Sequence, residues 1–231
     1  MRQRQLAALL HAGGWQYHHC MQSFDDLLRE AEAAHGHLCA GQILGVRMAM
    51  LGCLRLGIDD PKGADRKRLV TFVEIDRCAT DAIGVVTGCR LGKRALKFRD
   101  WGKMAATFVD LGSPLPNAGE PAYKAVRIAA LESSKERAHE LYPHIEQKNQ
   151  QQMMAYREMP EAELFSEEWV SVALGPREMP GYKSARVACA QCGEGINYDR
   201  QTKAAGRTLC QGCASPETRY YQPLGAHIGD S

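Results

Sequence analysis

Four cysteines near the C-terminus constrain the fold of this chain more than any other feature. They form the spacing C-x2-C-x17-C-x2-C, from Cys189 and Cys192 to Cys210 and Cys213. Each C-x-x-C pair brings two sulfurs within reach of one ion, and four thiolates suit a closed, structural zinc site. A module as short as residues 183–231 buries too little apolar surface to fold alone, so we expect zinc to stabilise it. A rubredoxin-like iron site and a redox dithiol pair are the alternatives.

The cysteine count and the charge balance limit the class of protein. The chain has nine cysteines among 231 residues, an odd number that suits metal thiolates in a reducing cytoplasm better than a disulfide framework. Its net charge of +2 is too small to indicate nucleic acid or membrane binding by itself. No apolar run approaches the roughly 20 residues of a membrane span, and the start "MRQRQLAALLHAGG" has too short an apolar patch for a signal peptide. We therefore expect a cytoplasmic protein with no membrane segment.

Helical and strand-like patterns alternate over the first 131 residues. The expected helices are 24–34, 39–56 and 78–89, and the expected strands are 68–76, 105–111 and 124–131. This alternation predicts an α+β domain with a mixed sheet flanked by helices. Within the second helix, Gly41, Gly45 and Ala49 form a stripe of small residues, which predicts the close approach of another backbone.

The composition changes after residue 131. Residues 132–168 carry nine glutamates against four lysines and arginines, and they read as helix with a break at Pro143. Prolines and glycines in 174–182 suggest a linker. The predicted division is a core domain over 1–131, an acidic helical arm and linker over 132–182, and the zinc module over 183–231. An arm and a small module both need surfaces to bury against, so we expect a homodimer.

The stretch "HGHLCAG" places His35, His37 and Cys39 at the start of the second helix, and Cys78 begins the third. Helix starts lower thiol pKa values, and thiolates beside imidazoles suggest an open metal site with a free fourth position. The residues alone leave other readings open, because cysteines also pack in cores and a histidine also caps a helix. A reversible Cys39–Cys78 disulfide, in a thiol redox protein, is a further alternative.

Three segments in this order resemble the family of the formylmethanofuran dehydrogenase E-subunit. They are "HGHLCAGQILGVRMA", "EIDRCATDAIGVVTGCRLGKRALKFRDWGKMA" and the C-terminal four-cysteine module. The resemblance implies a mixed five-stranded sheet flanked by helices, loosely related to thioredoxin, and a treble-clef zinc finger at the C-terminus. It also implies a core active site that can hold zinc, and the subunits of a molybdenum or tungsten oxidoreductase as partners.

The resemblance also suggests roles for the core residues. His37 and Cys39 match the family's H-x-C motif, and Cys78 and Asp81 match a cysteine and an acid of its second motif. We expect His37, Cys39 and Cys78 to bind a core zinc or another divalent metal. Asp81 is the expected general base, and His35 is the expected orienting group or alternative ligand.

Several other residues are less informative. Ala40 stands where the family usually has proline, a residue suited to the first helical turn. Cys53 and Cys89 are expected to pack in the core, and the cluster His18, His19 and Cys20 to lie in an N-terminal loop. A basic run follows Cys89, and it is either a solvated charge run or a rim that favours an anionic ligand; its members are Arg90, Lys93, Arg94, Lys97 and Arg99.

The sequence therefore predicts a metal-binding protein, accessory to a molybdenum or tungsten oxidoreductase, with an open core site and a structural four-cysteine zinc. The main alternatives are a stand-alone zinc-dependent enzyme and a regulator whose finger binds nucleic acid and whose core senses a metal or ligand. Residues 183–221 have six lysines and arginines against three acids, a weakly basic balance that suits protein contact as well as nucleic acid.

Overall fold

The computed structural model describes residues 21–116 and 119–222. The chain forms two compact units, one ending at Leu174 and the other beginning at Gly175. Each unit is described by itself below. None of the helices in these described ranges combines the length and the apolar character needed to cross a bilayer.

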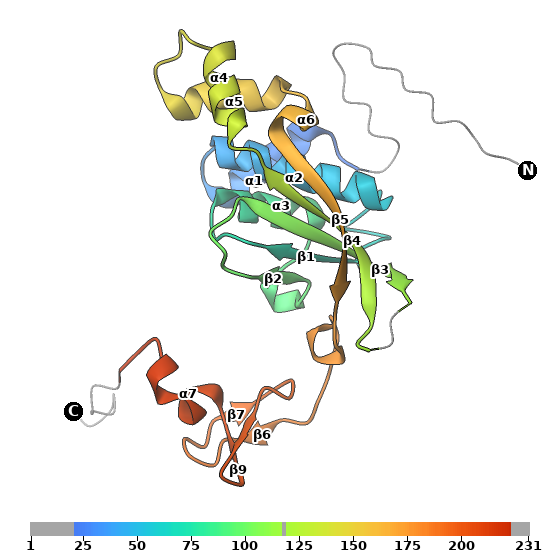
Figure 1. Cartoon of the computed structure of the whole chain (residues 1–231), viewed down its shortest axis with the longest axis vertical. Helices are drawn as coiled ribbons and strands as arrows, with labels where there is room; N and C mark the ends of the chain where they lie inside the picture. Colours follow the sequence, from blue (N-terminus) through green and yellow to red (C-terminus); the bar gives the residue numbers. More distant parts are fainter. Residues whose placement is uncertain (1–20, 117–118, 223–231) are drawn as a thin grey trace, which may run out of the picture. The chain divides into compact units, whose positions relative to one another are not determined.

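The first unit is built on a mixed five-stranded sheet, which confirms the predicted α+β class (Figure 1). The strand order is β2-β1-β3-β4-β5, with β1 and β2 parallel and the other neighbours antiparallel. The strands are β1 (Leu69–Val73), β2 (Leu96–Phe98), β3 (Ala105–Leu115), β4 (Ala122–Ala130) and β5 (Phe165–Ala173). Lys97, expected in a basic run, lies in β2 and is only 9% exposed.

Three helices position His35, His37, Cys39 and Cys78. They are α1 (Phe24–His35), α2 (Ala40–Leu56) and α3 (Cys78–Thr87). The long α2 is buried along most of its length and packs on β3 and β4. A Cβ added at Gly52 would lie 2.3 Å from the ring of Phe108, so the bare glycine lets the helix lie directly on the sheet.

The predicted close approach at the small-residue stripe is confirmed. A Cβ added at Gly45 would lie 2.5 Å from the carbonyl oxygen of Ala79, and one at Gly41 would lie 3.1 Å from the Cβ of Cys78. The backbones of α2 and α3 therefore touch at these positions. This contact brings the start of α3, with Cys78, against the start of α2.

The predicted acidic arm is wrong as a separate region. Residues after 131 form α4 (Ser133–Leu141), α5 (Lys148–Glu158), α6 (Glu161–Leu164) and then β5, which pairs with β4 along nine positions. The buried Arg47 of α2 donates from Nη1 to the carbonyl oxygens of Tyr156 (2.7 Å) and Met159 (2.6 Å). Tyr156, Met159 and Leu164 are each at most 1% exposed, so a few buried apolar side chains attach this acidic segment to the core.

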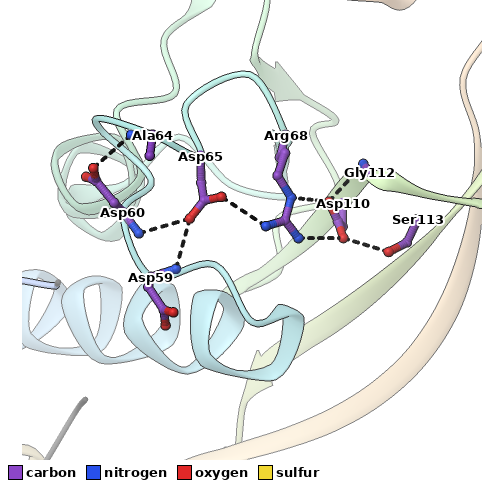
Figure 2. Close-up of polar contacts among 8 residues, drawn as sticks. All are labelled: Asp59, Asp60, Ala64, Asp65, Arg68, Asp110, Gly112 and Ser113. Carbon is purple, nitrogen blue, oxygen red and sulfur yellow. Dashed lines mark hydrogen bonds and ion pairs between the residues drawn. The ribbon is translucent and has the colours of Figure 1, made fainter. Parts of the chain in front are cut away.

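A polar network joins the turn before β1 to β3 (Figure 2). The Arg68 guanidinium donates to Asp65 at 2.9 Å and to both oxygens of Asp110 at 3.2 and 3.0 Å. Asp110 also accepts from the Gly112 amide and from the Ser113 hydroxyl. Burial alone would raise the pKa of Asp110, but these hydrogen bonds outweigh it and hold the pKa below its ordinary value.

The second unit consists of two small hairpins and a short helix. The hairpins are β6 (Val187–Ala188) with β7 (Gly195–Ile196), and β8 (Thr202–Ala204) with β9 (Arg207–Leu209); the helix is α7 (Gln211–Ala214). Short 3-10 turns occupy Leu91–Lys93 in the first unit and Pro176–Glu178 and Pro216–Thr218 in the second. The buried cluster of this unit contains two aliphatic residues and two cysteines, namely Cys189, Ile196, Leu209 and Cys213. So small an apolar core suits a unit that a metal stabilises.

Candidate metal centre

The C-terminal unit gathers its four cysteines at one point. The sulfurs of Cys189, Cys192, Cys210 and Cys213 all lie within 4.8 Å of one another. Cys189 follows β6, Cys210 follows β9, and Cys213 lies in α7, so the two hairpins bring the two pairs together. Four sulfurs in this arrangement fit one tetrahedral metal with no open position.

Hydrogen bonds favour the ionised form of Cys189, whereas burial and the neighbouring thiols raise the pKa of Cys192 and Cys213. The amide of Cys210 donates to the Cys189 sulfur at 3.3 Å, and Nη2 of Arg219 donates to the Cys213 sulfur at 3.3 Å. Backbone hydrogen bonds, first from Cys192 and then from Cys210, lower the pKa of Cys189 to about 6. The unit therefore stabilises one thiolate, that of Cys189, and places one cation, Arg219, beside the cluster, an arrangement that suits a metal–thiolate centre.

The first unit holds a second cluster on the loop between α1 and α2. Ligand atoms of His35, His37 and Cys39 all lie within 4.8 Å of one another, and the two imidazole ring centroids are 4.7 Å apart. Gly36 ends α1 at φ +95°, a left-handed conformation that glycine adopts without strain. The turn brings the last residue of α1 beside Cys39, the N-cap of α2.

His35 is held in an orientation that suits a metal ligand. Its Nδ1 lies 2.8 Å from Oδ2 of Asp81 on α3, so Nδ1–H donates to the carboxylate and Nε2 keeps a free lone pair. That Nε2 is buried and has no hydrogen-bond partner among the described residues. An unpartnered buried nitrogen is costly, and a metal ion would satisfy it.

Cys78 lies beside this cluster but outside the group of three. Its thiol interacts by a hydrogen bond with that of Cys39. Burial raises the pKa of the Cys78 thiol, and the neighbouring Cys39 raises it further. The expectation of a pKa lowered by the helix start is therefore wrong for Cys78, because burial and a second thiol outweigh the α3 dipole.

A cavity of about 410 Å³ opens beside the cluster, with His37, Cys39 and Cys78 in its wall. The opposite wall comes from α4 and α5, in the segment that we had assigned to an arm, and includes Ser134, Lys135, Asn149, Gln152 and Tyr156. Sequence reasoning missed these residues because no motif marks them. The basic run after Cys89 does not line the cavity; Arg77 and Lys135 supply its cations instead.

The departure from the family pattern at Ala40 has a structural counterpart. The amide of Ala40 donates to Oδ1 of Asn149 on α5 at 3.1 Å. A proline at this position would have no amide hydrogen to donate. With alanine at this position, the backbone amide links the start of α2, directly after Cys39, to Asn149 in the opposite wall of the cavity.

The other cysteines and histidines considered in the sequence do not belong to either cluster among the described residues. Cys53 and Cys89 are buried, as predicted, and burial raises the pKa of both thiols. The Thr71 hydroxyl donates to the Cys89 sulfur at 3.5 Å, which fixes that side chain within the core. The cluster of His18, His19 and Cys20 lies outside the described residues.

Comparison with known proteins supports the resemblance noted in the sequence. The family model described as "FmdE, Molybdenum formylmethanofuran dehydrogenase operon" matches residues 34–166. A solved structure of an FmdE-like protein from Syntrophus aciditrophicus, described as like the E-subunit of a tungsten formylmethanofuran dehydrogenase, superposes with a TM-score of 0.54. The match covers 86% of this chain and 95% of that one at 18% identity, which supports the fold.

A curated relative from Archaeoglobus fulgidus, described as a probable S-adenosyl-L-methionine-binding protein, is 39% identical over 84 residues. That match covers 36% of this chain and 23% of the relative, so the chain spans less than a quarter of the relative's length. The family model, in contrast, spans more than half of the present chain and includes the loop with His35, His37 and Cys39. This chain belongs to the FmdE family.

Proposed function

We propose that this chain is a metal-binding protein whose first unit holds a divalent metal, zinc by preference, at His35, His37 and Cys39. The buried and unpartnered Nε2 of His35, oriented by Asp81, is the observation that carries this proposal. Two imidazoles and one thiolate are a ligand set typical of zinc. In this proposal Asp81 orients a ligand rather than acting as the general base, and Cys78 borders the site without being a ligand.

The proposed core site has an open side, which separates its chemistry from that of the C-terminal unit. Three protein ligands leave a fourth position, and a zinc ion with such a position acts as a Lewis acid. His37, Cys39 and Cys78 border the cavity, so a small molecule entering it would meet that position. The chain itself contributes the fixed imidazole of His35 and the shape of the cavity.

Metal content tests the proposal directly. We expect two metal equivalents per chain by elemental mass spectrometry, and one after Cys39→Ser or His35→Ala. Cys78→Ser is the matched control, and it should retain both because Cys78 lies outside the group of three. One equivalent in the unaltered protein, located at the C-terminal cysteines, would contradict the core site. Loss of a metal in Cys78→Ser would instead make Cys78 a ligand.

We also propose a partner, and the family description supports the choice. That description refers to a molybdenum formylmethanofuran dehydrogenase operon, which supports an accessory role toward a molybdenum or tungsten oxidoreductase in the cytoplasm. Reciprocal co-purification of the tagged chain with components of such an oxidoreductase from its own cells tests this role. Failure in both directions, with the core metal present, would favour a stand-alone zinc-dependent enzyme.

For the C-terminal unit we propose a treble-clef finger with one structural zinc. The order of knuckle, hairpin and second knuckle leading into α7 supports this assignment. A homodimer is also proposed, and it now depends on this unit alone, because residues 132–173 pack on their own core. A molar mass of one chain by light scattering at micromolar concentration would contradict the dimer.

A further inference from the structure

The cavity beside the core cluster has the size and the lining of a small-molecule site. Its volume of about 410 Å³ falls within the range typical of ligand pockets, about 300–1,000 Å³. Apolar side chains make up part of the lining, among them Leu44, Met104, Ala130 and Leu131. Such a site binds an organic molecule with an apolar body and a few polar groups.

The charges around the cavity are unequal. Lys135 pairs with Glu132 at 2.5 Å, and both residues line the cavity, so they neutralise each other. Arg77, the N-cap residue of α3, also lines it and has no carboxylate partner among the described residues. Its guanidinium therefore leaves the cavity with an unbalanced positive charge. The N-termini of α2 and α3 border the same space and add to the positive potential.

A second polar side chain in the lining also makes no hydrogen bond within the described residues. Gln152 on α5 is half-buried, and its amide makes no hydrogen bond within the described part of the chain. Asn149, by comparison, accepts from the amide of Ala40. A free guanidinium and a free amide in one cavity are the groups that bind a carboxylate: the first gives a bidentate ion pair and the second a directional hydrogen bond.

We infer that this cavity binds a small organic monocarboxylate, whose carboxylate lies between Arg77 and the open position of the core metal and whose apolar body packs on the aliphatic lining. This inference rests on the proposed metal site for one of its two anchors. Arg77 is the other anchor and is independent of the metal. A carboxylate is favoured over a phosphate because Arg77 is the single unbalanced side-chain cation of the cavity and apolar side chains make up part of its lining.

The test uses the full-length protein with its measured metal content and four probes: acetate, benzoate, phenylacetate and hexanoate. Isothermal titration calorimetry should show binding that is tighter for the three larger acids than for acetate. Hexanamide, the neutral counterpart of hexanoate, should not bind. Arg77→Gln should weaken hexanoate about 10- to 100-fold, because it removes a charge-assisted pair. Arg66→Gln, at an exposed arginine outside the cavity, is the control for net charge and should not change the affinity.

The outcomes separate the two proposals. Two metals per chain with no binding of any probe at about 10 mM would overturn the carboxylate site and leave the metal site standing. Equal binding of hexanoate and hexanamide, or no effect of Arg77→Gln, would also overturn it. In the Cys39→Ser protein, which we expect to lack the core metal, residual binding that still depends on Arg77 would support Arg77 as an anchor. If Cys39→Ser bound hexanoate as tightly as the unaltered protein, the contact between carboxylate and metal would be refuted, and the Arg77 contact would stand.

Discussion

The two candidate metal clusters of this chain differ in how the fold depends on them. The C-terminal cluster lies in a unit whose buried group contains two aliphatic side chains and two of its own cysteines. The core cluster lies on a loop of a unit with a large apolar core. Under the proposed function, metal binding stabilises the fold of the C-terminal unit, whereas in the first unit the fold positions the ligands. Under that proposal, the four-cysteine cluster serves stability and the cluster of His35, His37 and Cys39 serves an open site.

Removal of metal should show this contrast most strongly. Structural zinc binding supplies about 10 kcal/mol or more of folding free energy in small fingers, so chelation should unfold the C-terminal unit. The first unit should remain folded, because its core is apolar. The two tryptophans in the described residues, Trp101 and Trp169, belong to the first unit, and the sequence has none after residue 174, so tryptophan fluorescence does not report on the C-terminal unit. We expect unchanged fluorescence together with loss of the amide signals of residues 185–222.

Cys213→Ser should reproduce the effect of chelation without removing the core metal. The control is Cys39→Ser, which should lose the core metal and leave the C-terminal amide signals in place. If chelation unfolded both units together, the contrast between the two clusters would be wrong.

The next largest effect is expected at the contact between α2 and α3. Gly45→Ala would place a methyl group 2.5 Å from the Ala79 carbonyl oxygen, and we expect a loss of about 3 kcal/mol in the stability of the first unit. Because α3 carries Asp81, core metal affinity should fall as well. Gly84→Ala is the matched control, since its Cβ would lie 3.4 Å from the nearest atom and helix propensity would improve. Tryptophan-detected urea unfolding measures the stability of each variant. If Gly45→Ala were as stable as Gly84→Ala, the close contact between α2 and α3 would be contradicted.

Asp81→Asn tests whether a carboxylate controls the core metal from outside its ligand shell. An asparagine keeps the size of the side chain but removes the charge that fixes the tautomer of His35. Core metal affinity should fall about 10- to 100-fold, with the fold intact and the C-terminal metal unaffected. Asp76→Asn, at an exposed acid that lies just before α3, is the control for charge. Complete loss of folding would show that the His35–Asp81 pair is structural.

Acid should destabilise the first unit through protonation of the Asp110 carboxylate. The pKa of Asp110 is held below its ordinary value in the folded unit, so its contribution to stability is fully present above the unfolded pKa, near 4. That contribution is lost as the pH falls through the lower folded pKa. Asp110→Asn should therefore cost about 2 kcal/mol at pH 7 and much less near pH 2, by tryptophan-detected unfolding. An equal cost at both pH values would show that the carboxylate charge is not what stabilises the β3 network.

The C-terminal cluster and the core differ also in how far the sequence predicts them. The cysteine spacing predicted a local four-sulfur cluster, because all four ligands lie within 25 residues and two short hairpins suffice to join them. The helix starts at Cys39 and Cys78 and the contact at Gly45 were also predictable from local patterns. The hydrogen bond between His35 and Asp81 was not, because it joins residues 46 positions apart through the packing of α1 on α3.

The prediction from composition was wrong for the glutamate-rich segment after residue 131, because only a few of its residues are buried. The glutamate-rich segment after residue 131 read as an arm, yet β5 completes the sheet and α5 contributes one wall of the cavity. Most of its charged side chains are exposed, while Tyr156 and Leu164 face the core. A net charge averaged over 37 residues carries no information about which side chains face inward.

The smallest predicted effect concerns Ala40, and a double-mutant cycle resolves it. Cys39 has φ −146° and ψ 169°, an extended conformation that suits a following proline, so Ala40→Pro introduces no backbone strain. The variant loses the hydrogen bond to Asn149 and gains rigidity in the unfolded chain, and these effects nearly cancel, within about 1 kcal/mol. Asn149→Ala alone should cost about 1 kcal/mol, and much less in the Ala40→Pro background.

If the two changes were additive instead, the Ala40 amide would not couple α2 to α5. Coupling has a consequence for the contrast between the clusters. The core ligand Cys39 would then be held by an element from the far wall of the cavity, so a ligand that moved α5 would act on the metal site. The C-terminal cysteines are held by their own hairpins, so the same cycle should leave their metal affinity unchanged.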